Sequence, residues 1–90
     1  MLSQVKIALR VTTTHFDGEI QALIDACKRD LELAGVCDIQ EADALIMRAI
    51  ILYCKASFGY DNPDSEKFQK SYDLLKCSLS LAGDYNVKVE

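Results

Sequence analysis

The sequence has no tryptophan, one histidine, one proline and four glycines among its 90 residues. The single histidine, His15, leaves no partner for an HExxH-type metal site. So little proline and glycine argues against a disordered or all-β chain. Long hydrophobic runs are also missing, because the apolar stretch 42–58 holds at most six consecutive uncharged residues, 49–54. A membrane-spanning helix needs about 20 apolar residues, so we expect no membrane span.

The sequence also has fewer basic than acidic residues. Ten Lys and Arg residues face fourteen Asp and Glu residues, which leaves a net charge of −4. Proteins that read nucleic-acid sequence need a basic surface to neutralise phosphates, so this class is disfavoured. Residues 1–11 are apolar, but they lack the long uncharged segment and small-residue cleavage site of a secretory signal. We therefore expect folding in a cytosol.

The four cysteines are spaced too widely for a metal site. Cys27, Cys37, Cys54 and Cys77 lie 10, 17 and 23 residues apart, whereas zinc sites usually contain CxxC-like pairs. We interpret them as small apolar residues, three of them in helices, that stay reduced. The sequence also contains no Gly-rich phosphate loop or nucleophile motif. We expect no metal ion, no cofactor and no enzymatic activity.

Hydrophobic periodicity predicts an all-α fold, a small bundle of three main helices plus a short N-terminal helix. The expected helices span residues 2–11, 18–34, 42–58 and 63–81. The third is apolar on nearly every side of a helical wheel, which is typical of a buried helix. It is therefore the predicted centre of the bundle. Residues 1–83 are expected to form the helical domain, and residues 84–90 a tail with no helical period.

Residues with a preference for helix ends mark the expected boundaries. Candidate N-caps are Ser3, Asp17, Asp38 and Asn62, the last followed by a proline in the first turn. Gly35 is expected to end the second helix. In the last helix, three- and four-residue spacing predicts one inward face, which two further leucines are expected to widen: Phe68, Tyr72, Leu75, Leu79 and Ala82, with Leu74 and Leu81.

Three cations are candidates for contacts with a partner. Lys6 and Arg10 are four residues apart on one face of the first helix, and we expect them to point to solvent or to a partner. Arg48 lies near the middle of the central helix. If its guanidinium is buried, it needs a carboxylate, either on an adjacent subunit or within the chain, where the candidates are Asp25, Asp30 and Asp73.

Aromatic side chains are the other interface candidates. Seven Phe and Tyr residues are many for so small a core, and aromatic residues are enriched at protein interfaces. Those near the ends of the expected helices are the candidates for exposure: Phe16, Phe58, Tyr60 and Tyr85. Core packing is the alternative interpretation of this set.

The chain as a whole, over about residues 2–85, resembles the small head–tail connector (adaptor) proteins of long-tailed bacteriophages, which are often labelled DNA packaging proteins. The most specific part is 58–64, Phe-Gly-Tyr-Asp-Asn-Pro-Asp, which continues into Phe68 and 72–75, Tyr-Asp-Leu-Leu. Weaker matches occur earlier in the chain, at Val5-Lys6, Leu9-Arg10-Val11, Phe16-Asp17, Glu19-Ile20, Leu23-Ile24, Asp30-Leu31, Gly35-Val36, Leu45-Ile46 and Leu52-Tyr53.

The resemblance implies a structural protein of the virion. Such proteins form a ring that docks below the portal once the head is filled, extends the DNA channel and receives the tail-side proteins. The implied partners are copies of itself, the portal protein and tail or completion proteins, and DNA would pass through without sequence-specific binding. Residues 84–90 would be a portal-gripping arm. The implied locations are the host cytoplasm during assembly, or the bacterial cytoplasm for a prophage, and then the virion neck.

Two other interpretations remain open. A generic helical module that binds one partner protein would stay a monomer or dimer, so the size of the oligomer separates it from a ring-forming connector. A helix-turn-helix DNA-binding protein is compatible with the number of helices. It is disfavoured because the chain is acidic and lacks a basic recognition helix.

Overall fold

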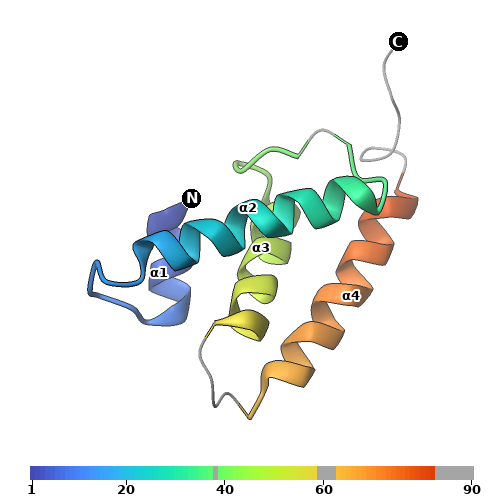
Figure 1. Ribbon diagram of the computed structural model, residues 1–90. Coiled ribbons are helices and arrows are strands. Elements are labelled where there is room, and N and C mark those ends of the chain that lie inside the picture. The colour runs from blue at the N-terminus through green and yellow to red at the C-terminus, as the bar shows by residue number, and fades with distance from the viewer. Residues whose placement is uncertain (38, 59–62, 83–90) are drawn as a thin grey trace.

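The computed structural model describes residues 1–37, 39–58 and 63–82 (Figure 1). Within these ranges the chain forms four helices and no strand: α1 (Leu2–Leu9), α2 (Asp17–Leu33), α3 (Ala44–Ser57) and α4 (Ser65–Leu81). The predicted all-α fold, with three long helices and a short first one, is confirmed. The expected tail, 84–90, lies outside the described residues. None of the four helices is long and apolar enough to cross a membrane.

Helix α3 is the centre of the fold, as its composition predicted. It packs against each of the other three helices, and Figure 1 shows α1, α2 and α4 arranged around it. Its fully buried side chains include Ile46, Ala49, Ile50 and Cys54. Burial is not complete around the helix, however, because Arg48 is exposed. The helix is therefore covered on the sides that face α1, α2 and α4 and open to solvent between them.

The first turn of α3 is held by Asp43. Its carboxylate oxygen accepts hydrogen bonds from the backbone N–H groups of Leu45, at 2.8 Å, and Ile46, at 3.3 Å. These N–H groups have no partner within the helix, so the cap replaces a bond that water would otherwise supply. The helix therefore begins at Ala44, two residues later than predicted. The predicted cap, Asp38, lies outside the described residues.

The core is apolar and contains two of the four cysteines. Its largest fully buried side chains come from α2, α3 and α4, and include Ile20, Ile24, Leu31, Ile50 and Tyr72. Cys27 and Cys54 are also fully buried, Cys37 is partly buried and Cys77 is exposed. Burial raises the pKa of Cys27 to about 12 and that of Cys54 to about 11. Both therefore stay protonated at neutral pH and pack as small apolar groups.

Helix α1 ends earlier than predicted, at Leu9 instead of residue 11. Arg10 adopts the left-handed conformation, with φ of 60° and ψ of 38°, and the Val11 N–H donates to the Lys6 carbonyl at 3.0 Å. This is the hydrogen bond of a Schellman-type helix end, in which the left-handed position is usually glycine. The predicted cap Ser3 is wrong, because Ser3 lies inside α1 and Met1 occupies the cap position.

The two ends of α2 differ in how well the sequence predicted them. Gly35 follows the helix with φ of +99°, and the Val36 N–H donates to the Leu31 carbonyl at 3.0 Å, which confirms Gly35 as the terminating residue. Asp17 is not the N-cap, since Phe16 occupies that position without a side-chain cap bond. The Asp17 carboxylate instead pairs with Lys6 of α1. The ion pair with Lys6 has therefore replaced the helix cap that the sequence predicted for Asp17.

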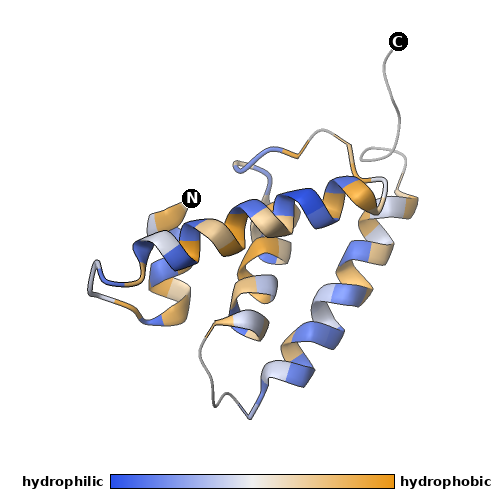
Figure 2. Ribbon diagram, viewed as in Figure 1, coloured by the Kyte–Doolittle hydropathy of each residue, from blue (hydrophilic) through white to orange (hydrophobic). Residues whose placement is uncertain are grey.

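The prediction for α4 was right about its inward face and wrong about two leucines. Tyr72 and Leu79 are buried, with Phe68 and Leu75 packed against the core. Leu74 and Leu81, expected to widen that face, are 69% and 76% exposed. At 100° per residue they lie on the opposite side of the helix. Figure 2 shows the resulting mixture of hydrophobic and hydrophilic residues along α4.

The end of α1 gives a prediction about stability. Holding a residue that has a Cβ in the left-handed conformation destabilises the fold by roughly 1–2 kcal/mol. Glycine avoids this strain, but it loses more conformational entropy on folding. We expect Arg10→Gly to raise the free energy of unfolding by about 0.5–1 kcal/mol, measured by urea denaturation. Arg10→Ala is the control, because it removes the same charge but keeps the Cβ. Equal stabilities for the two variants would contradict this explanation.

Candidate functional site

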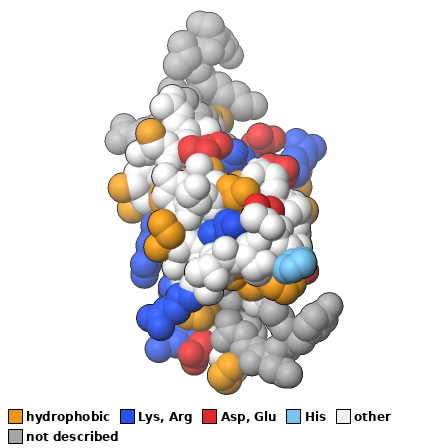
Figure 3. All heavy atoms as spheres, turned by 90° about the vertical axis from the view of Figure 1, so that its left-hand side faces the viewer, with side chains coloured by type: hydrophobic (Ala, Val, Ile, Leu, Met, Phe, Trp, Pro, Cys, Tyr) orange, Lys and Arg blue, Asp and Glu red, His pale blue; other side chains and the backbone are white. Residues whose placement is uncertain are grey.

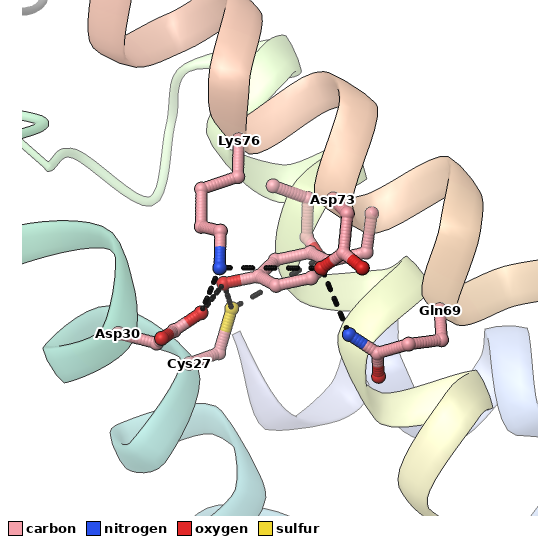
Figure 4. Close-up of polar contacts among 7 residues, drawn as sticks. Cys27, Asp30, Gln69, Asp73 and Lys76 are labelled. Carbon is pink, nitrogen blue, oxygen red and sulfur yellow. Dashed lines mark hydrogen bonds and ion pairs between the residues drawn. The ribbon is translucent and has the colours of Figure 1, made fainter. Parts of the chain in front are cut away.

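The largest buried side chain, Tyr72 of α4, is the centre of a polar cluster between α2 and α4 (Figure 4). Its hydroxyl donates to Asp30 Oδ2 at 2.6 Å and accepts from the Cys27 thiol at 3.7 Å. The ring packs edge-on against Tyr53 of α3, with centroids 5.2 Å apart. The residue therefore links three helices through one side chain. Burial, followed by the hydrogen bond to Asp30, raises the Tyr72 pKa, so its hydroxyl keeps its proton.

Lys76 closes the solvent side of this cluster. Its ammonium donates to Asp30 Oδ2 at 3.1 Å and lies 5.3 Å from the centroid of the Tyr72 ring. Asp73 lies 4.0 Å from the same ammonium and accepts a hydrogen bond from Gln69 at 3.0 Å. Partial burial opposes ionisation of Asp30, but the hydrogen bonds from Tyr72 and Lys76 outweigh it and lower the Asp30 pKa. This arrangement is a structural tie between α2 and α4.

Three further ion pairs attach the N-terminal helix and the α2–α3 connection. Lys6 Nζ lies 2.7 Å from Asp17 Oδ1, and the Lys6 side chain is 17% exposed. Lys28 Nζ lies 2.6 Å from Glu41, whose other oxygen lies 3.7 Å from the terminal amine of Met1. Lys6 therefore does not point freely to solvent, because its charge is paired inside the chain, and Arg10 is the exposed cation of the two. A contact of Lys6 with a partner stays a prediction.

Two predicted interface residues, Phe16 and Phe58, contact each other. Their ring centroids are 5.4 Å apart with planes at 86°, an edge-to-face pair that joins the start of α2 to the end of α3. Phe16 remains 44% exposed and Phe58 is partly buried. The space-filling view in Figure 3 shows the single histidine beside a band of hydrophobic side chains on this face. The pair thus has a structural role and still offers aromatic surface.

The remaining candidates are placed as follows. Arg48 is exposed and makes no ion pair with any residue that the structure describes, so the buried pairing considered for it does not occur. Tyr60 and Tyr85 lie outside the described residues. The sequence reasoning missed Asp30, Tyr72 and Lys76 as a unit, because they come from two helices more than 40 positions apart.

Exposed leucine and isoleucine side chains are the most unusual surface feature. Ile7 in α1, Leu33 in α2 and the pair Leu74 and Leu81 in α4 are each 69–77% exposed. Single exposed apolar residues are common, but here they lie on the outward sides of three different helices. Among the described residues no group of three or more His, Cys, Asp or Glu side chains could hold a metal ion. The surface features therefore point to protein contacts.

A family model described as phage connector protein matches residues 1–86. The match covers almost the whole chain. The chain belongs to the phage connector protein family. No curated protein and no solved structure matches it. The family is structural, and its role lies in the assembly of phage particles, which is consistent with apolar side chains left on the surface of this connector.

The buried hydroxyl of Tyr72 can be tested directly in this connector. Removing it in Tyr72→Phe breaks a hydrogen bond to an ionised carboxylate, and such bonds contribute about 1.5–3 kcal/mol. We expect a loss of about 1–2 kcal/mol in the free energy of unfolding, because Asp30 keeps Lys76 and some contact with water. Tyr53→Phe is the matched control, expected to cost under about 0.5 kcal/mol. Equal losses for both variants would contradict a tie between α2 and α4.

The same cluster predicts a dependence of stability on pH. A carboxyl whose pKa is lower in the folded than in the unfolded state stabilises the fold above its unfolded pKa and loses that effect as pH falls through the folded pKa. For Asp30 the ordinary value is 3.8, so stability should fall below about pH 4. Denaturant titrations from pH 6 to 2.5 should show a shallower fall in Asp30→Asn. Asp25→Asn, an exposed position on the same helix, should follow the wild type.

Proposed function

We propose that this protein is a ring-forming head–tail connector. Copies assemble head to tail below the portal once the head is filled, extend the DNA channel and join the head to the tail. Membership of the phage connector family over residues 1–86 carries this proposal. Its place in the particle is the virion neck, after assembly in the host cytoplasm, and its partners are the portal protein and tail-side proteins.

The exposed apolar side chains support assembly from identical copies. A closed ring is built from one heterologous contact, so each chain must present two different adhesive surfaces. α1 presents Ile7, next to the exposed Arg10 at its end, α2 presents Leu33, and α4 presents Leu74 and Leu81 on its outward side. These surfaces belong to different helices and differ in charge. The chain therefore presents at least the two different surfaces that head-to-tail closure requires.

The acidic composition suits a channel through which DNA slides. With a net charge of −4, the ring would carry few free cations to bind phosphates, and each Lys or Arg bound to a phosphate would add salt-sensitive affinity. In this proposal the DNA passes without sequence-specific binding, and the protein has no enzymatic activity. Residues 84–90, outside the described part of the chain, would act as the arm that grips the portal.

The alternative is a helical module that binds a single partner protein. The exposed leucines would also serve that function, because a groove-binding partner needs apolar surface. The two proposals differ in the size of the assembly, since the module stays a monomer or dimer. The family match favours the connector.

Oligomer size tests the proposal. We expect mass photometry and negative-stain images to show rings at high protein concentration or in the presence of the portal protein. Arg48→Ala should leave the free energy of unfolding within about 0.5 kcal/mol of the wild type, because the side chain is exposed. As an interface residue, it should reduce the fraction of chains in rings. Monomers under all these conditions would contradict the connector function, and normal rings in Arg48→Ala would remove this residue from the interface.

A further inference from the structure

The outward side of α2 has a regular pattern that its core packing does not use. Its five members are separated by alternating steps of three and four residues and are all exposed: Glu19, Ala22, Ala26, Arg29 and Leu33. We call them the α2 stripe. Leu33 is 72% exposed, and Glu19 has no hydrogen bond or ion pair in the described structure. Residues at 3-4 spacing lie along one side of a helix, which is how the facing residues of a coiled-coil seam are spaced.

The outward side of α4 repeats the pattern with the same spacing and length. Its members are Lys67, Lys70, Leu74, Cys77 and Leu81, and all five are exposed. We call them the α4 stripe. Both stripes span fourteen residue steps (19 to 33 and 67 to 81), or about 21 Å of helix. The N-terminal end of the α4 stripe is basic and makes no ion pair among the residues described, and its C-terminal end is apolar.

We propose that the α2 stripe of one chain packs in parallel against the α4 stripe of the next chain and forms the repeated contact of the ring. This inference rests on the proposed connector function and names its interface. In register, Glu19 meets Lys67, Ala26 meets Leu74 and Leu33 meets Leu81. The small alanine leaves room for the leucine opposite. The acidic and basic ends meet each other, and the apolar ends meet each other.

The same residues disfavour every other pairing of the stripes. Two α4 stripes in parallel would place Lys67 against Lys67, and two α2 stripes would place Glu19 against Glu19, which is repulsive. Antiparallel pairings would place a charged end against Leu33 or Leu81. Charges at the flanks of a helix seam select its partner and direction in this way. The contact between two different stripes, which is the contact a ring needs, pairs charged ends of opposite sign and joins the two apolar ends.

The arrangement of the helices within one chain permits this contact. Figure 1 shows α2 and α4 running toward the same end of the molecule, and Tyr72 and Lys76 of α4 contact Asp30 near the C-terminal end of α2. In a ring of many subunits, neighbours differ by a small rotation. The seam requires this rotation to bring the α4 of one chain alongside the α2 of the next, at the crossing angle of about 20° that such seams adopt.

Cross-linking at the middle of the seam tests the proposal. Arg29→Cys, made with Cys37→Ser to remove the partly buried thiol, places a thiol opposite the native Cys77 of the neighbouring chain. Because every chain then carries both partners, mild oxidation should give a ladder of dimers, trimers and higher species on a non-reducing gel. Asp25→Cys in the same background is the matched control, since it is exposed on α2 but outside the stripe, and it should give no ladder.

A charge exchange provides the second measurement. Glu19→Lys should reduce ring formation at least severalfold and abolish the ladder, and adding Lys67→Glu to the same chain should restore both. Thermal melts by circular dichroism confirm that each variant folds. If rings form but the Arg29→Cys ladder is no stronger than the control, or the exchange does not restore assembly, this interface is wrong and the connector function stands. If the wild type forms no ring with its portal, both proposals fail.

Discussion

The need to cover α3 determines the rest of the structure. This helix is too apolar to be exposed, and in a chain of 90 residues three other helices must cover it. Each of them can use only one face for this purpose, because a helix packs on a partner with a stripe of its surface. The opposite faces of α1, α2 and α4 are left uncovered, and part of their apolar surface with them. Burial of the centre thus creates the outward surfaces from which an assembly can be built.

A polar contact ties α2 to α4 beside the central helix. The backbones of these two helices make less contact with each other than either makes with α3, and Tyr72 reaches across to Asp30. A buried hydroxyl must have a partner, so the bond restricts how the two helices can sit relative to each other. Lys76 then neutralises the carboxylate at the edge facing water. The packing of both helices on α3 and this hydrogen bond together fix the relative direction of α2 and α4, on which the proposed ring contact depends.

The helices were predictable from the sequence and their ends less so, for a physical reason. Periodicity is a local property, and it identified all four helices and the central position of α3. Capping is a competition between local and distant partners: Asp17 is a plausible cap in the sequence, yet it pairs with Lys6 across a connection. The contact between Phe16 and Phe58 was also not predictable from local sequence. Phe16 and Phe58 were selected singly, but their contact joins segments 42 positions apart, and no local pattern indicates such a contact.

The two misplaced leucines show how a surface can be mistaken for a core. Leu74 and Leu81 are apolar and close in sequence to Leu75 and Leu79, so a broad inward face seemed to include them. The rotation of 100° per residue instead puts them opposite Tyr72. A monomeric protein would gain solubility from polar residues at both sites, and about 25 cal/mol per Å² is gained only when such leucines are covered. Uncovered leucines at heptad spacing therefore leave apolar surface on α4 that a neighbour in the proposed ring would cover.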